Sequence, residues 1–183
     1  TSVLEGYPDS NKFIVTIGVN DANGTLFTPS GLGCGGSQCN GTFKGNLQAI
    51  INQLSTAGKS VLVNLAPPRF GDPFQAPYTD PANHARNLLI RDGYNAVIAN
   101  ELTGRQVGAN LYNYFLGSEN RFYLYATNLH PNALGYEVMA RLIYNALTGN
   151  STPPFVASAL CLRLSQGGAC ANPLPYKENL MEP

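Results

Sequence analysis

The chain has 183 residues, of which 44% are hydrophobic and only 12% are charged, and its 11 basic and 11 acidic side chains leave no net charge. A chain of this length and composition can bury one sizeable core, which excludes a disordered protein. A neutral chain lacks the surplus of Lys and Arg that binds phosphates, so we expect no nucleic-acid partner. No apolar run approaches the ~18 residues of a membrane span, so we expect no transmembrane segment.

The first half of the chain predicts a strand, a helix and a second strand. Lys12 to Gly18 is a β-branched run ending on glycine, which predicts a buried parallel strand. Apolar residues at helical spacing predict a helix over 44–57, which Gly58 ends. Ser60 to Leu65 predicts a second buried strand. The Pro-rich and aromatic segment 66–81 predicts a long irregular loop, a place where function is often found.

The second half continues the alternation of helices and strands. Residues 83–102 predict a helix, and Gln106 to Leu111 predicts a weaker strand. Asn132 is expected to cap a last helix over 133–148, and Gly149 is expected to end it. This alternation predicts an α/β fold, in which a parallel sheet is flanked by helices in three layers. Ligands in such folds bind at the carboxyl ends of the strands.

Four cysteines form two close pairs, each around a Gly-rich loop. Three connectivities are possible, and the local one, Cys34–Cys39 and Cys161–Cys170, is the simplest. Neither pair has the C-x2-C spacing typical of zinc sites, so we expect no metal. Two disulfides would indicate an oxidising compartment, and therefore a secreted or periplasmic protein.

Two segments that follow predicted strands or loops carry groups suited to catalysis. The first is Gly18-x-Asn20-Asp21, and the second is His130-Pro131-Asn132-x-x-Gly135-Tyr136. They resemble the third and fifth sequence blocks of the GDSL, or SGNH, hydrolase family. The intervening segment 61–68 resembles the strand and loop between those blocks, and the resemblance covers residues 8–148 in order.

This resemblance implies an SGNH-type, flavodoxin-like fold and the hydrolysis of acyl esters through an acyl-enzyme. His130 matches the family's general base, and Asn20 matches the donor to the oxyanion. Gly18 and Asp21 are expected to shape the turn. The family requires no metal and no organic cofactor. Residues 1–149 would then be the carboxyl-terminal part of one such domain, with 150–183 as a Pro-rich tail on it.

The chain departs from the family in two places. The nucleophilic serine is missing, because the nearest match, Pro8-Asp9-Ser10, precedes the first predicted strand instead of following one. Thr127 stands where the family has the acid that orients the histidine, so a backbone carbonyl or a carboxylate such as Glu119 would have to replace it. We therefore expect an incomplete sheet, and a separate amino-terminal chain of the same precursor that carries the serine.

Other interpretations of these residues remain open. Acyl transfer to an alcohol would use the same groups, and a non-catalytic binding module could retain the fold without the triad. His130 could belong to a simple helix-capping turn, and Asn20 with Asp21 could merely end a strand. His84, at a predicted helix start, is expected to be a surface residue.

Overall fold

The computed structural model describes residues 3–23, 41–70, 81–117, 124–127 and 129–150. The chain divides into two compact units, one comprising Thr1–Ala66 and Leu88–Ala109, the other Pro67–Asn87 and Asn110–Pro183. Among the helices of the described ranges, none is both long and apolar enough to cross a membrane. The tail expected over 150–183 lies almost wholly outside these ranges, and its assignment to the same domain stays a prediction.

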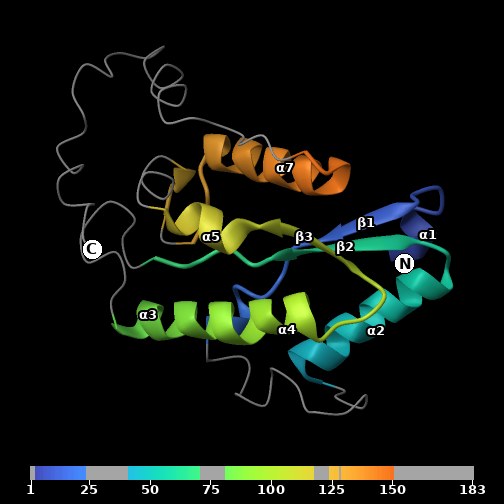
Figure 1. Ribbon diagram of the computed structural model, residues 1–183, viewed down its shortest axis with the longest axis horizontal. Helices are drawn as coiled ribbons and strands as arrows, with labels where there is room; N and C mark the ends of the chain where they lie inside the picture. Colours follow the sequence, from blue (N-terminus) through green and yellow to red (C-terminus); the bar gives the residue numbers. More distant parts are fainter. Residues whose placement is uncertain (1–2, 24–40, 71–80, 118–123, 128, 151–183) are drawn as a thin grey trace. The chain divides into compact units, whose positions relative to one another are not determined.

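A parallel three-stranded sheet forms the centre of the first unit. Its strands are β1 (Lys12–Val15), β2 (Ser60–Leu65) and β3 (Gln106–Asn110), in the order β1-β2-β3 (Figure 1). β1 and β2 pair in register from Lys12 opposite Ser60 to Val15 opposite Val63. Val61, Leu62 and Val63 are fully buried or nearly so. The predicted α/β fold with a parallel sheet and flanking helices is thus confirmed.

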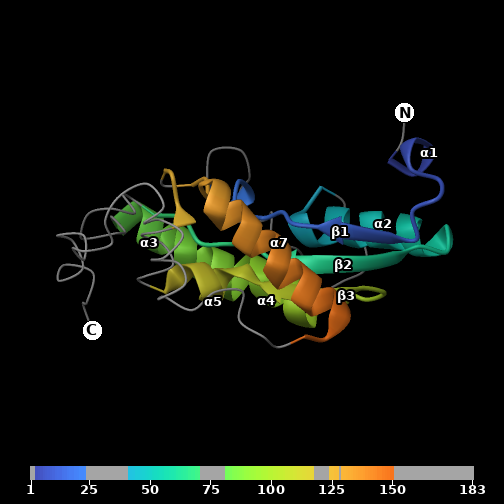
Figure 2. The ribbon, with the colours of Figure 1, turned by 90° about the horizontal axis from the view of Figure 1, so that it is seen from above.

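The expectation of a buried first strand is wrong in one respect. β1 ends at Val15 and forms the edge of the described sheet, so Ile14 is 47% exposed and Ile17, just beyond the strand, is 38% exposed. The short helix α1 (Val3–Gly6) lies near the amino end of this strand (Figure 2). The β-branched composition predicted the strand correctly, but composition does not show whether other strands pair with both edges of β1.

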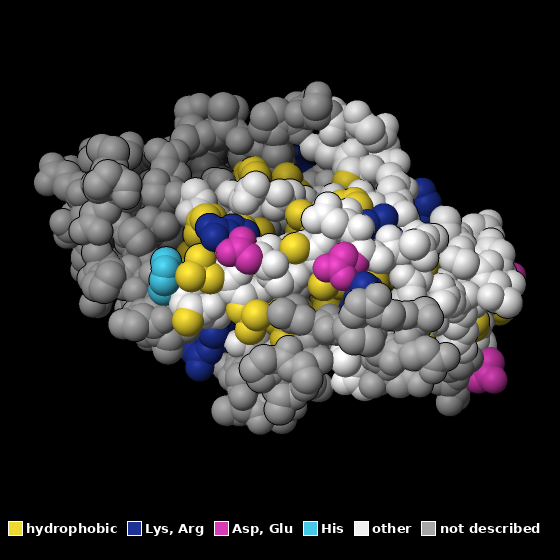
Figure 3. Space-filling view, turned by 60° about the horizontal axis from the view of Figure 1, so that its bottom comes forward, with side chains coloured by type: hydrophobic (Ala, Val, Ile, Leu, Met, Phe, Trp, Pro, Cys, Tyr) yellow, Lys and Arg dark blue, Asp and Glu magenta, His cyan; other side chains and the backbone are white. Residues whose placement is uncertain are grey.

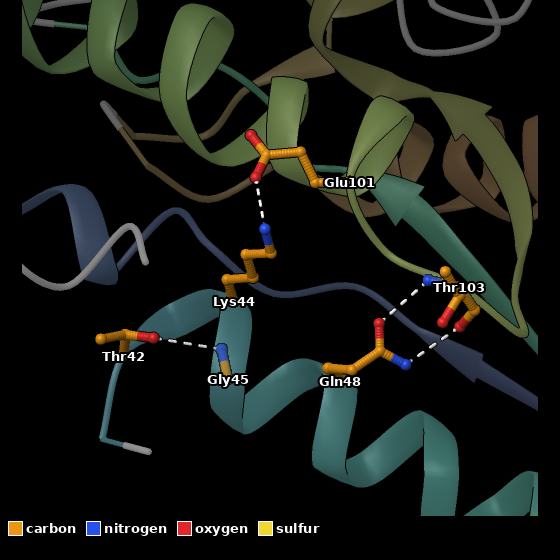
Figure 4. Close-up of polar contacts among 6 residues, drawn as sticks. All are labelled: Thr42, Lys44, Gly45, Gln48, Glu101 and Thr103. Atoms are coloured by element: carbon orange, nitrogen blue, oxygen red, sulfur yellow. Dashed lines mark hydrogen bonds and ion pairs between the residues drawn. The ribbon is translucent and has the colours of Figure 1, made fainter. Parts of the chain in front are cut away.

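Helix α2 (Phe43–Thr56) agrees with the prediction to within one residue at each end. The hydroxyl of Thr42 caps it by accepting a hydrogen bond from the Gly45 N–H at 3.1 Å (Figure 4). Gly58 follows in the left-handed region with φ +72°. Phe43, Leu47, Ile51 and Leu54 face the core, whereas Ile50 remains 43% exposed.

Polar contacts fasten α2 to the segment that precedes β3. Lys44 Nζ lies 2.7 Å from a carboxylate oxygen of Glu101 (Figure 4). The Gln48 amide donates to the Thr103 carbonyl at 3.1 Å and accepts from the Thr103 N–H at 2.9 Å. Such a two-point contact between an amide and a backbone fixes position more firmly than an exposed ion pair.

The helix expected over 83–102 is present as a continuous helical stretch over 81–100, which contains three segments. They are α3 (Pro81–Leu88), the π-helical segment η3 (Leu89–Tyr94) and α4 (Asn95–Asn100). A π-turn holds one residue more than an α-turn, and this extra residue is invisible to apolar spacing. Gly93, a weak helix former, lies in the π-helical segment.

The second unit contains α5 (Leu111–Leu116) and α7 (Ala133–Thr148). The Asn132 side chain caps α7 by accepting from the Gly135 N–H at 2.9 Å, and Gly149 ends it with φ +71°. Both predicted ends of this helix are confirmed. The core of the unit consists of fully or almost fully buried apolar and aromatic side chains, which include Phe70, Phe115, Leu124, Tyr125 and Val138.

Some of the charged side chains on the described surface form close pairs of opposite sign. Arg91 and Asp92 are 2.6 Å apart, and Arg141 lies 3.1 Å from Glu137. Figure 3 shows acidic side chains lying beside basic ones on one face. Exposed pairs of this kind contribute little to stability, about 0–1 kcal/mol each.

Candidate active site

Gly18 lies in the turn that follows β1 in the first unit. Its φ of +114° is rarely adopted by residues with a side chain. A Cβ at this position would lie 3.4 Å from the Ala66 Cβ and 3.6 Å from the Tyr94 Cβ. The Gly18 carbonyl accepts a hydrogen bond from the Ala22 N–H at 3.3 Å and closes the turn. The backbone conformation therefore explains the glycine in this position.

Asn20 and Asp21 have different surroundings within the same turn. Asn20 is exposed, and within the part of the chain that the structure describes no hydrogen bond occupies its side-chain amide. Asp21 begins a short 3-10 turn, η1 (Asp21–Asn23), and its backbone carbonyl accepts from the Tyr94 hydroxyl at 3.1 Å. Burial and the Asp21 carboxylate both raise the pKa of Tyr94, so its hydroxyl stays a donor. The turn is thus anchored while the Asn20 amide can donate to a ligand.

A buried asparagine joins the carboxyl ends of the three strands. Asn64, at 0% exposure, donates from Nδ2 to the Thr16 hydroxyl at 2.8 Å and accepts at Oδ1 from the Ala109 N–H at 2.9 Å. Gly108 makes room for it, because a Cβ there would collide with Asn64 Oδ1. The sequence interpretation did not identify Asn64. The available signal was one amide within the otherwise apolar run Ser60–Leu65.

A second buried asparagine fixes the residue that follows β2. Asn95 Oδ1 accepts from the Ala66 N–H at 2.7 Å, and Asn95 Nδ2 donates to the Ala66 carbonyl at 3.1 Å. Asn95 is the first residue after the π-helical segment, and Tyr94, the last residue within it, packs edge-on against Phe43. The end of the π-helical segment thus places Tyr94 and Asn95 next to each other, where Tyr94 contacts the turn after β1 and Asn95 holds the residue after β2.

His130 lies on a tight loop in the second unit, and its side chain is exposed. Its backbone carbonyl accepts hydrogen bonds from the N–H groups of Ala126 at 2.9 Å and Thr127 at 3.3 Å. Its own N–H donates to the Thr127 hydroxyl oxygen at 3.0 Å. Hydrogen bonds therefore fix both the N–H and the carbonyl of His130. Its exposed imidazole can contact a ligand while the backbone of the loop is held in place.

Thr127 also approaches the imidazole itself. Its Oγ1 lies 3.4 Å from Nδ1 of His130, and the same oxygen accepts from the backbone N–H groups of Leu129 and His130. These two bonds occupy both lone pairs of the hydroxyl, which leaves its hydrogen to be donated. Thr127 is therefore poorly suited to hold the Nδ1–H proton, which the acid of a catalytic triad does.

Tyr125 fastens the His130 loop to the core of the second unit. It forms an antiparallel bridge with Pro131, and its hydroxyl donates to the Pro68 carbonyl at 3.3 Å. Its ring packs edge-on against Phe70 and Phe115, with centroids 4.8 Å and 5.5 Å away. These contacts place the residue after His130 on a rigid support.

Gly135 explains a further part of the His-Pro-Asn-x-x-Gly pattern. The Asn132 N–H donates to the Leu124 carbonyl at 2.7 Å. A Cβ at Gly135 would collide with that same carbonyl and would lie 2.7 Å from Pro131 Cβ. The first turn of α7 can thus approach the Leu124 backbone only because position 135 has no side chain.

The predicted site residues divide between the two units. Gly18, Asn20 and Asp21 belong to the first unit, whereas Thr127 and His130 belong to the second. Ser10 precedes β1, whereas Gly18 follows it, so strand β1 separates Ser10 from the turn that carries Asn20. His84 is exposed, as expected. Glu119 and the four cysteines lie outside the described residues, and so do both expected disulfides. Nowhere in the described ranges do three metal-binding side chains meet.

Comparison with known proteins bears on this arrangement. No curated protein and no solved structure matches the chain significantly. The model of the GDSL-like Lipase/Acylhydrolase family matches residues 4–138, which include Gly18, Asn20, Asp21 and the whole His130 loop. This range covers well over half of the chain, and it agrees with the parallel sheet and with the two turns described above. The chain belongs to the GDSL-like lipase/acylhydrolase family, and its activity is accordingly of the lipase or acylhydrolase type.

Proposed function

We propose that the chain forms part of a secreted serine hydrolase that cleaves carboxylic esters through an acyl-enzyme. The observation that carries this proposal is the exposed imidazole of His130 on a loop closed by its own backbone hydrogen bonds. A base of this kind can take a proton from a serine and return it to the leaving alcohol. Secretion is supported by the two disulfides that the cysteine pairs predict.

The proposed reaction gives His130 and Asn20 the roles that the family resemblance implies for them. A serine oxygen attacks the ester carbonyl while His130 takes its proton, and the Asn20 amide donates a hydrogen bond to the developing oxyanion. His130 then protonates the leaving alcohol, and water attacks the acyl-enzyme with His130 again as the base. One oxyanion donor contributes about 3 kcal/mol of transition-state stabilisation, which is the contribution expected of Asn20.

The serine is proposed to come from a separate amino-terminal chain of the same precursor, bound at the edge of β1 that no described strand covers. A cavity of about 490 Å³ borders that edge, and its mostly apolar walls include Leu4, Phe13 and Ile50. The exposed side chains of Ile14 and Ile17 flank it. A free strand edge beside an apolar cavity suits an added parallel strand, which would cover both.

A fluorophosphonate serine probe tests the origin of the nucleophile. The purified protein is treated with the probe, denatured, reduced and examined by intact mass spectrometry. We expect two chains, with the probe on the chain that is not this one. A single unlabelled species would contradict the proposal and favour a non-catalytic binding module, which the uncharged Thr127 beside His130 also supports.

Substitution of the two histidines tests the assigned base. His130→Ala is expected to lower the hydrolysis of a short p-nitrophenyl ester by at least about 1,000-fold, because the general base is lost. His84→Ala is the matched control, since the chain contains only these two histidines and His84 is also exposed in the second unit. Full activity in His130→Ala would exclude the enzymatic proposal.

A further inference from the structure

Arg69 is a buried cation that the proposed reaction does not use. Its residue exposure is only 8%, and its Nε and Nη1 atoms are buried without a hydrogen-bond partner among the described residues. Buried guanidinium groups ordinarily have partners, because removing their N–H donors from water without replacement is costly. These two nitrogens carry most of the donors of the group.

The backbone of Arg69 is fixed from both sides. Its N–H donates to Asn87 Oδ1 at 2.7 Å, and its carbonyl accepts from Asn87 Nδ2 at 2.6 Å. Asn87 is itself buried, and its carbonyl accepts from the Tyr112 hydroxyl at 3.2 Å. Buried residues of the second unit thus hold the backbone of Arg69 in place. The residue belongs to the interior of this unit and not to its surface.

Within the described part of the second unit, the charged group that acts on Arg69 is another cation, and no carboxylate pairs with it. Burial lowers the pKa of Arg69, and the nearby Arg86 guanidinium lowers it further. Arg86 Nη1 donates to the neutral Asn83 side chain at 3.2 Å. Among the described residues of the second unit the only carboxylate is Glu137, which pairs with Arg141.

We propose that Arg69, with Arg86 beside it, binds an oxyanion, which is a carboxylate, phosphate or sulfate group of a ligand. An oxyanion would satisfy the buried donors through charge-assisted hydrogen bonds and would relieve the repulsion between the two arginines. Arginine suits this role because its charge persists under all ordinary conditions.

The neighbours of Arg69 connect this site to the His130 loop within the second unit. Pro68 accepts from the Tyr125 hydroxyl, and Phe70 packs against the Tyr125 ring. Tyr125 in turn pairs with Pro131, the residue after His130. If the proposed esterase function holds, on which this step rests, the preferred substrate is an ester that carries an anionic group.

Thermal unfolding in sulfate and in chloride tests the site without recourse to catalysis. At matched ionic strength, sulfate at saturating concentration is expected to raise the Tm of the wild-type protein by about 5 °C relative to chloride. The same shift is expected in Arg141→Gln, which removes an exposed arginine of the same unit. In Arg69→Met only the general stabilisation that sulfate gives to any folded protein is expected to remain, so the shift should be clearly smaller. A sulfate shift as large in Arg69→Met as in the wild type would overturn the proposal.

The Tm of Arg69→Met, measured without sulfate, provides a second test of the proposed site. Arg69→Met is expected to unfold at the same Tm as the wild type or higher, because it removes an unpartnered buried charge. A variant that fails to fold, or that unfolds many degrees lower, would contradict the proposal by showing that the guanidinium is already paired in the free protein.

Matched esters distinguish a free ion from a group carried by the substrate. The ratio of kcat/KM for p-nitrophenyl hemisuccinate to that for p-nitrophenyl butyrate is expected to fall about 10-fold or more in Arg69→Met and to remain unchanged in Arg141→Gln. An unchanged ratio in Arg69→Met, with the sulfate effect intact in the wild type, would overturn the substrate assignment and indicate a free anion as the ligand. Failure of the wild type to hydrolyse either ester would overturn the proposed function instead. Thermal unfolding in sulfate would still show whether Arg69 binds an oxyanion.

Discussion

The hydroxyl of Tyr94 donates a hydrogen bond to the backbone carbonyl of Asp21, 3.1 Å away, and this bond links the π-helical segment to the turn that carries Asn20. We expect Tyr94→Phe to lower kcat for ester hydrolysis about 5-fold with little change in KM, since one neutral hydrogen bond contributes about 1 kcal/mol. Steady-state kinetics measure both constants.

The matched control for this substitution is Tyr144→Phe, which removes the hydroxyl of a tyrosine that is 61% exposed. Tyr144→Phe is expected to keep the wild-type kcat. If Tyr94→Phe lowered only the Tm and left kcat intact, Tyr94 would serve stability alone and would not position Asn20.

Thr127→Asp would restore a carboxylate beside the imidazole of His130. The carboxylate oxygens can accept the N–H groups of Leu129 and His130, as the Thr127 hydroxyl does now, and can also accept from Nδ1–H. We expect kcat to rise about 10-fold, because the ring would be held in the tautomer that leaves Nε2 as the base. Thr127→Asn, which has the same shape without the charge, is the control in the same ester assay. An equal rise in both variants, or none in either, would show that charge at this position does not limit the reaction.

Gly135→Ala should destabilise the second unit. The added methyl group would collide with the Leu124 carbonyl and with Pro131, so the start of α7 would have to move. We expect a loss of about 2–4 kcal/mol in the free energy of unfolding, measured by urea denaturation. Gly6→Ala is the control, because no atom lies within 4 Å of the added Cβ there. A loss below about 1 kcal/mol would show that the loop before α7 moves easily to make room for the methyl group.

The buried phenol of Tyr125 should make stability depend on alkaline pH. Burial, together with the nearby Tyr136, raises the pKa of Tyr125 above its ordinary value of 10.0. Above about pH 10 the unfolded chain releases this proton while the folded chain keeps it, so stability falls as pH rises. Tyr125→Phe should remove part of that fall, and it should cost about 1 kcal/mol at neutral pH because the bond to the Pro68 carbonyl is lost.

Urea denaturation at pH 8 and at about pH 11 measures this difference, with Tyr144→Phe again as the exposed control. The wild type and Tyr144→Phe should lose stability in parallel between the two conditions, and Tyr125→Phe should lose less. Parallel losses in all three proteins would place the alkaline sensitivity elsewhere in the chain.

Elements determined by local signals were predictable from the sequence. Helix α7 was predicted with both ends because Asn132 and Gly149 act on their own backbone neighbours. Helix α2 was predicted from its apolar spacing, and strand β2 was predicted from its short, mostly apolar run. The extra residue in η3 was missed, since it leaves no periodic trace in the sequence. The exposed edge of β1 agrees with the incomplete sheet that was expected from the missing first strand of the family, although the strand itself was expected to be buried.

The candidate site was predictable only in part, and for a similar reason. Gly18 and Gly135 are explained by their immediate surroundings, and the two turns that contain them were found by resemblance to a family. The side chains of Asn64 and Asn95 form hydrogen bonds with strand ends that are far away in the sequence. Arg69 stands out only because two of its buried nitrogens have no hydrogen-bond partner among the described residues. Such relationships appear only once the chain is folded.

The Asn64 amide has a consequence for how uniquely the sheet can assemble. Apolar strands such as β1 and β2 tolerate a slip of two residues, because their side chains keep the same faces and Val, Ile and Leu are largely interchangeable. After such a slip Asn64 would lose Thr16 or Ala109, and a buried amide would be left without its partners. One polar side chain thus selects a single alignment among several that the apolar contacts would accept.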